Sequence, residues 1–128
     1  MVGSTRLFST DTITPVRPTG IAKSLNIGDP AAGVYALEAV RRTGGWMDAA
    51  DDDEIRDAVR LLARTTGIFA ETAGGVTVAV LRKLVASGKL DPDAETVVFN
   101  TGEGLKTIDA VAASRGGSRR GLSTLPPG

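Results

Sequence analysis

The 128-residue chain contains neither cysteine nor histidine, and aromatic residues make up only 4% of it. Without histidine there is no Ser-His-Asp or Cys-His relay, and without both residue types zinc and iron–sulfur sites lose their usual ligands. Disulfides are impossible, so the composition gives no indication of secretion, and we expect a cytoplasmic location.

The chain also lacks a net charge and long apolar runs. Fifteen Lys and Arg balance fifteen Asp and Glu, which removes any global electrostatic case for a nucleic-acid or anionic-membrane partner. No apolar run approaches the ~20 residues that span a bilayer, and the start MVGSTRLFSTDT has no apolar core of a secretory signal. The length suits one domain.

The most clearly specified element is a helix over residues 51–66. Asp51 and Glu54 have the spacing of an N-terminal capping box, and Gly67 is a typical stop. Asp52 and Arg56, like Asp57 and Arg60, lie at ion-pairing distance along such a helix. The predicted buried stripe consists of Ile55, Ala58, Val59 and Leu62.

Other helical segments are less regular. Residues 31–42 follow Asp29 as a possible N-cap and Pro30 at the first helical position, and end at Gly44. Their predicted inward face consists of Val34, Leu37, and Ala36 or Val40. Residues 73–87 are apolar over more than half the helix circumference, which predicts packing on most sides. Residues 20–27 and 105–112 favour shorter helical segments.

About three short strands complete the pattern. Residues 96–100 form a continuous apolar run typical of a fully buried strand, 46–50 are a further candidate, and 13–16 are at most a short strand. Helices alternating with strands predict an α/β fold with a parallel sheet. Because three short strands make only a small sheet, we expect the core to need packing partners that this chain does not supply. Residues 1–19 are predicted to form an extended arm, and the Gly/Ser/Arg/Pro-rich residues 113–128 a disordered tail.

Two loops are candidate ligand sites. Residues 101–104 (TGEG) follow the predicted strand at its carboxyl end, where open α/β sheets bind ligands. The Thr101 hydroxyl can donate or accept a hydrogen bond without carrying charge. A phosphate loop is disfavoured because the third glycine of a dinucleotide fingerprint is absent and Glu103 would repel phosphate. An ordinary strand–helix turn is the plain alternative.

The second candidate is Glu71-Thr72-Ala73-Gly74-Gly75, where an acid ends an apolar run before a helix. Glu71 can equally be a helix-capping residue that favours the helix dipole. The acidic run at 51–54 has a spacing that suits capping better than metal binding, so no metal site is expected. Arg115, Arg119 and Arg120 resemble a small RNA-binding tail, but a solvated terminus is the favoured interpretation.

Three segments in order carry a family resemblance: residues 20–30 (GIAKSLNIGDP), 67–75 (GIFAETAGG) and 100–106 (NTGEGLK). Together they resemble the carboxyl-terminal part of threonine synthase, a pyridoxal-phosphate enzyme of the tryptophan-synthase-β fold type. The resemblance covers about residues 12–112. It implies that residues 20–112 belong to a partial three-layer parallel-sheet domain of the fold-type-II pyridoxal-phosphate enzymes.

The resemblance also implies a function, the conversion of O-phosphohomoserine and water to threonine and phosphate, which is a lyase reaction of threonine biosynthesis. Thr101 matches the position that hydrogen-bonds the pyridine nitrogen of the cofactor, and Gly102 shapes that loop. Glu71, Ala73 and Gly74 match the segment beside the ring. Thr72 and Glu103 depart from the Pro, and the Asn or His, that the family often carries.

The family's Schiff-base lysine and its glycine-rich phosphate loop lie upstream of the matched region. Lys106 matches the trailing G-L-K of the family and not the Schiff-base motif. We therefore expect the chain to supply one wall of the cofactor site, to contain no catalytic residue, and to be inactive alone. Its expected partner is a missing amino-terminal half or a full-length homologue, and a homodimer is possible.

Two alternatives to a truncated threonine synthase stay open. The chain could be a non-catalytic accessory or dimerisation module that binds a full-length pyridoxal-phosphate enzyme. It could also contact RNA through its Arg-Gly tail, which we rank last.

Overall fold

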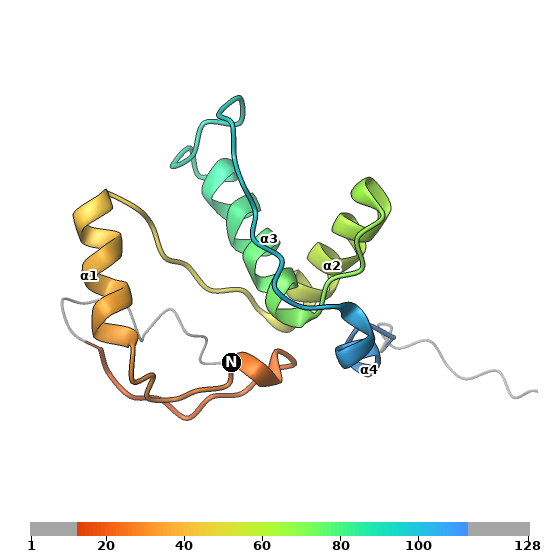
Figure 1. Cartoon of the computed structure of the whole chain (residues 1–128), viewed down its shortest axis with the longest axis horizontal. Coiled ribbons are helices and arrows are strands. Elements are labelled where there is room, and N and C mark those ends of the chain that lie inside the picture. The colour runs from red at the N-terminus through yellow and green to blue at the C-terminus, as the bar shows by residue number, and fades with distance from the viewer. Residues whose placement is uncertain (1–12, 113–128) are drawn as a thin grey trace, which may run out of the picture.

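The computed structural model describes residues 13–112, and that part of the chain is helical. α2 and α3 pack against each other as a V, while α1 stands apart at the end of a long extended connection (Figure 1). The elements are η2 (Lys23–Leu25), α1 (Gly33–Thr43), α2 (Asp52–Thr66), α3 (Thr72–Ala86), η3 (Gly104–Thr107) and α4 (Ile108–Ala112).

The predicted capping box of α2 is confirmed. The Asp51 carboxylate accepts the Glu54 N–H at 2.8 Å, and the Glu54 carboxylate accepts the Asp51 N–H at 2.8 Å. The helix ends at Gly67, whose φ of 77° places it in the left-handed region that glycine adopts most easily. Local chemistry therefore sets both ends of α2.

The core lies between α2 and α3 and consists of small side chains. Ala58 and Val59 are fully buried on α2, and Val78 and Ala79 are buried on α3. Leu62, the fourth residue of the predicted stripe, is partly buried against this cluster. The predicted buried face of α2 is thus largely confirmed, and its small residues let the two helices approach closely.

α1 forms where it was expected and ends at Gly44, but two of its details were predicted wrongly. Its N-cap is Ala32 and not Asp29. Val34 is 64% exposed, whereas Leu37 is buried. Val34 is exposed because α1 makes no extensive contact with another helix of residues 13–112.

The predicted parallel sheet is not confirmed, because no strand is present in residues 13–112. Their one isolated bridge is antiparallel and joins Ala70 to Glu103. Residues 13–16 and 46–50 are extended without strand pairing. Residues 96–100, expected to be a buried strand, are extended and exposed, with Val97 at 76% and Phe99 at 77%. A strand needs a neighbour for its backbone hydrogen bonds, and none lies beside this segment.

Hydrogen bonds tie the extended connections to the helices. The Lys83 ammonium donates to the Ala49 carbonyl oxygen at 2.7 Å, and the Ile21 N–H donates to the Asp52 carboxylate at 3.1 Å. The predicted Asp52–Arg56 ion pair is therefore wrong: Arg56 pairs with Asp53 at 3.1 Å. Arg60 pairs with Asp57 as expected, at 3.5 Å.

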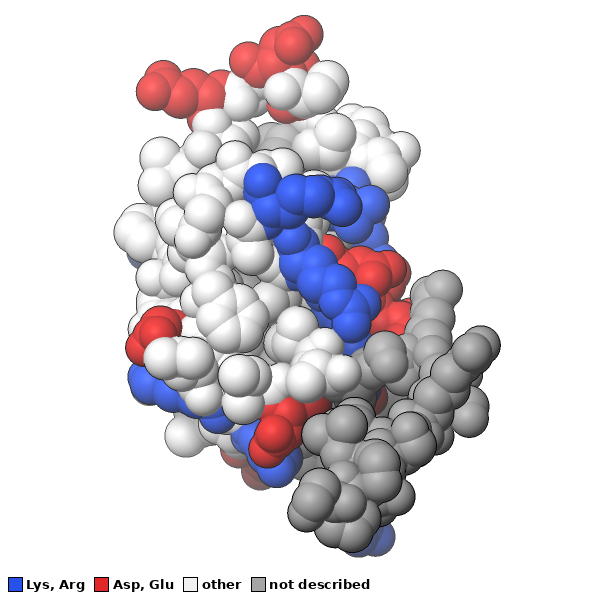
Figure 2. Space-filling view, turned by 90° about the vertical axis from the view of Figure 1, so that its right-hand side faces the viewer, with Lys and Arg blue, Asp and Glu red and all other residues white. Residues whose placement is uncertain are grey.

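The surface is mixed in charge, with basic and acidic side chains side by side next to a broad uncharged area (Figure 2). Over residues 13–112, no helix has the length and apolarity that crossing a membrane requires. The predicted tail at 113–128 and most of the predicted arm lie outside the described residues.

Candidate functional site

The two loops singled out in the sequence lie together. The Glu71 N–H donates to the Gly102 carbonyl oxygen at 3.1 Å, and the Gly104 N–H donates to the Phe69 carbonyl oxygen at 2.8 Å. These bonds flank the antiparallel bridge between Ala70 and Glu103. Segments some thirty residues apart are thereby joined into one short two-stranded contact at the start of α3.

Glycines allow this close approach. A Cβ added at Gly102 would collide with the Glu71 carboxylate, and one added at Gly104 would lie 2.5 Å from the Phe69 ring. At Gly74 an added Cβ would lie 2.5 Å from Oδ1 of Asn100. The predicted shaping role of the 101–104 glycines therefore has a steric basis, since larger residues would separate the loops.

The start of α3 is held by a second contact. The Thr72 N–H donates to the Thr107 hydroxyl oxygen at 3.2 Å, which links α3 to η3. The Thr72 side chain is fully buried, and its own hydroxyl has no hydrogen-bond partner in the described part of the chain. A buried polar group without a partner is unusual and costly.

The structure brings together the predicted site residues Thr101, Gly102, Glu71, Ala73 and Gly74. Thr101 is exposed and its hydroxyl makes no hydrogen bond to residues 13–112, whereas Glu71, Ala73 and Gly102 are half-buried and Gly74 is buried. Glu71 is the N-cap residue of α3, as the capping alternative predicts, but its side chain accepts no capping hydrogen bond. The carboxylate lies against Gly102.

Sequence reasoning missed three participants: Phe69, Asn100 and Thr107. Phe69 packs its ring on Gly104, and Asn100 packs its amide on Gly74. A signal existed for Asn100, since it is a polar residue that ends an apolar run beside a glycine loop. No local pattern marks Thr107, because its partner Thr72 lies 35 residues away.

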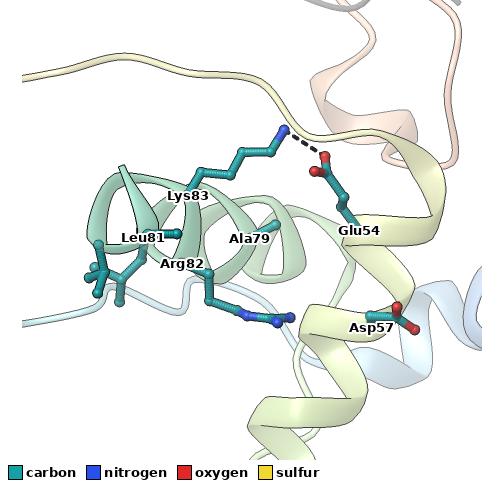
Figure 3. A pocket seen from close by; sticks show the side chains of 8 residues that line it. Glu54, Asp57, Ala79, Leu81, Arg82 and Lys83 are labelled. Atoms are coloured by element: carbon teal, nitrogen blue, oxygen red, sulfur yellow. Dashed lines mark ion pairs between the residues drawn. The ribbon is translucent and has the colours of Figure 1, made fainter. Parts of the chain in front are cut away.

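A separate groove of about 670 Å³ lies between α2 and α3 and contains none of the predicted site residues. Glu54 and Lys83 form an ion pair at 2.7 Å across it, and Arg82 and Asp57 extend into it from opposite helices (Figure 3). The Lys83 ammonium is already held by two oxygens, those of Glu54 and Ala49. This groove is open to solvent and is distinct from the two-loop contact.

Residues 13–112 hold no cluster of three or more acidic side chains arranged to bind a metal ion. The acidic run at 51–54 is used within the protein: Asp51 and Glu54 form the capping box, Asp52 accepts from Ile21, and Asp53 pairs with Arg56.

Comparison with known proteins assigns this arrangement to a family. Residues 4–102 match the family model of the pyridoxal-phosphate dependent enzymes. The chain belongs to that family. The match covers both segments of the two-loop contact up to Gly102.

Curated relatives of this pyridoxal-phosphate family member are threonine synthases. The enzyme of Methanocaldococcus jannaschii is 40% identical over 110 residues, which are 86% of this chain and 27% of the relative. The enzyme of Bacillus sp. (strain ULM1) is 41% identical over 97 residues, 76% of this chain and 28% of the relative. That of Mycobacterium tuberculosis is 38% identical over 92 residues, 72% of this chain and 26% of the relative. The chain spans about a quarter of the length of these relatives.

The site residues fit one side of the family's cofactor. A ring nitrogen needs a hydrogen-bond donor, and Thr101 presents an exposed hydroxyl that no other described residue engages. None of the five site residues is a lysine, so the lysine that would bond the cofactor's carbonyl carbon would have to lie outside this set. Thr101, Gly102 and Glu71 would contact only the ring edge of the cofactor.

Proposed function

We propose that this chain is the carboxyl-terminal portion of a threonine-synthase-like enzyme and supplies the pyridine-ring side of its cofactor site. The supporting observation is the two-loop contact, in which the Glu71–Gly102 and Phe69–Gly104 hydrogen bonds hold the loop of the exposed Thr101 against the start of α3, with the Glu71 carboxylate next to Gly102. The whole enzyme would convert O-phosphohomoserine and water to threonine and phosphate in the cytoplasm.

Pyridoxal phosphate, when bound, acts as an electron sink for the carbon atoms of the substrate. The part of this chain is to orient the ring. The Thr101 hydroxyl would donate a hydrogen bond to the ring nitrogen, and as a neutral group it would give that nitrogen no proton. Gly102 lets the Glu71 side chain lie against the loop, and Glu71 fixes the loop through its own N–H, so the two residues would hold Thr101 in place.

The rest of the site comes from a partner in this proposal. Residues 96–100 lead directly into Thr101 and expose an apolar surface of Val97, Val98 and Phe99. Such a surface fits a segment that a larger protein covers. The partner is an amino-terminal half carrying the Schiff-base lysine and the phosphate-binding loop, and the isolated chain is inactive.

Complementation tests the proposal. The chain would be mixed with the amino-terminal part of a threonine synthase relative, truncated where the similarity to this chain begins, and phosphate release from O-phosphohomoserine would be measured. We expect release only from the mixture. Thr101→Val, which removes the hydroxyl at constant shape, should lower the rate at least tenfold, whereas Thr101→Ser should stay within a few-fold of the native rate.

Phosphate release by the isolated chain would contradict the proposal that it supplies only one wall of the cofactor site. Full activity of Thr101→Val would contradict the proposed role of the Thr101 hydroxyl. A second candidate shares the same exposed surface: an accessory module that docks on a full-length pyridoxal-phosphate enzyme, or on a second copy of itself. Stable binding to an intact threonine synthase, with no gain of activity from the truncated one, would favour that module.

A further inference from the structure

Backbone hydrogen bonds anchor the 101–104 loop at Gly102 and Gly104, and none anchors the residues just before it. No backbone hydrogen bond joins residues 95–100 to any other part of residues 13–112, and the segment is exposed throughout. The loop is therefore held by the Glu71–Gly102 and Gly104–Phe69 hydrogen bonds, and by η3 and α4, which follow it.

α4 cannot hold this position by itself. None of its described residues, Ile108–Ala112, is buried, so burial of apolar side chains does not hold them in place. Its hold on the rest of the protein comes from two arginines of α2. Arg56 Nε donates to the Ala110 carbonyl oxygen at 2.9 Å, and Arg60 donates to the Val111 carbonyl oxygen at 3.1 Å.

Arg56 is the better anchored of the two. Its side chain is 19% exposed, against 46% for Arg60, and its ion pair is shorter, 3.1 Å to Asp53 against 3.5 Å to Asp57. The acceptors of Arg56 lie on different elements, and it reaches them with different nitrogens, Nε to Ala110 and a terminal nitrogen to Asp53. The planar guanidinium presents these two donors in a fixed geometry that a flexible lysine side chain does not reproduce.

We propose that Arg56 is a positioning residue for the Thr101–Gly102 loop, acting through the Ala110 carbonyl oxygen and α4. α2 packs on α3, which begins beside Glu71, while Arg56 holds α4, which follows Thr107 and the loop. The Arg56 side chain thus links the two loops of the site: through α2 it is connected to the start of α3 beside Glu71, and through α4 to the 101–104 loop. The inference deepens the proposed function and rests on it for the loop's role as cofactor contact, but not for the anchoring itself.

The anchoring is tested on the full chain by amide hydrogen exchange followed with NMR. The reporter is the Gly104 N–H, which is bonded to Phe69, and the reference is the amides of the middle of α2. Arg56→Met should speed exchange of the Gly104 amide about tenfold, and Arg56→Lys should do so by several-fold, because lysine lacks the fixed fork geometry with which Arg56 reaches Ala110 and Asp53. Arg64→Met, an exposed arginine of the same helix, is the matched control and should change neither amide.

If Arg56 only stabilised the fold, Arg56→Met would speed amide exchange throughout α2 as much as at Gly104, and it would lower the unfolding midpoint. That result, an unchanged Gly104 rate, or a Gly104 amide unprotected in the native chain would overturn the inference. A second measurement, the pyridoxal phosphate Kd of the complemented enzyme, separates the two proposals. Faster Gly104 exchange with an unchanged Kd supports the anchoring and refutes the cofactor role of the loop; faster exchange with a weaker Kd supports both.

Discussion

Thr72 is the least satisfied residue in the described core. Its side chain is fully buried and its hydroxyl has no partner among residues 13–112, while its N–H is bonded to Thr107. Leaving a buried hydroxyl without a hydrogen bond costs about 1–3 kcal/mol. The cost falls at the first residue of α3, beside the two-loop contact.

Replacing this hydroxyl by a methyl group should stabilise the protein. Thr72→Val keeps the shape and the N–H bond to Thr107, and we expect the free energy of unfolding to rise by about 1 kcal/mol. Urea unfolding followed by circular dichroism measures the change. Thr77→Val, at an exposed position of the same helix, is the control and should have little effect. A clear loss of stability in Thr72→Val would mean that the hydroxyl has a partner after all.

At the scale of elements, the packing of α2 on α3 depends on one glycine. A Cβ added at Gly75 would lie 2.7 Å from Cγ2 of Val59 and 2.9 Å from the Ile55 carbonyl oxygen. The second of these atoms belongs to the backbone of α2 and cannot move by changing a rotamer. The two helices can lie this close only because position 75 has no side chain.

Gly75→Ala therefore sets two effects against each other. Alanine gains about 1 kcal/mol of helix propensity over glycine, whereas overpacking a closely packed contact typically costs 1–3 kcal/mol. We expect a net loss of about 1 kcal/mol, because a backbone carbonyl is one of the clashing atoms. Thermal unfolding of Gly75→Ala against Thr77→Ala, an exposed site of α3, isolates the clash. A more stable Gly75→Ala would show that α2 shifts freely.

Glu54 links two elements, since its carboxylate accepts from Asp51 in the capping box and pairs with Lys83 of α3. Glu54→Gln should keep the cap and lose the ion pair, whose side chains are about one-third exposed, for a cost below about 1 kcal/mol. Glu54→Ala loses both interactions and should cost about 1–2 kcal/mol. Equal losses in the two variants, measured by urea unfolding, would assign the effect to the ion pair and not to the cap.

These elements also show what could be predicted from the sequence. α2 was predictable because its signals are local: Asp51 and Glu54 cap one end and Gly67 ends the other. The meeting of Glu71 with Gly102 was predictable through the family resemblance, but Thr107 and Arg56 were not, because their partners are 35 and 54 residues away. The predicted sheet was not confirmed because a strand needs a neighbouring strand, and residues 96–100 make no backbone hydrogen bond to another described segment.

At the scale of the whole molecule, the described residues leave much apolar surface open. The exposed large side chains occur on α1, on the connection after it and on the segment before Thr101, and include Val34, Tyr35, Trp46, Val97 and Phe99. Monomeric soluble proteins seldom leave contiguous apolar patches of this kind uncovered. Two of these groups of exposed side chains, on α1 and at 96–100, belong to segments that lie apart in the fold (Figure 1).

The surface at 96–100 should be the one that matters for complementation, since it leads into the site. Val97→Ser with Phe99→Ser removes two exposed apolar side chains, each contributing about 1.5–3 kcal/mol when fully buried. We expect about a hundredfold weaker Kd for the amino-terminal partner, measured by titration, and a clear drop in the fluorescence of an apolar dye on the isolated chain. Val34→Ser with Tyr35→Ser, on the exposed face of α1, is the matched control: it should lower dye binding as well but change the Kd less than tenfold. Equal losses of affinity in both double variants would mean that association follows total apolar surface, and the 96–100 segment would have no particular role in it.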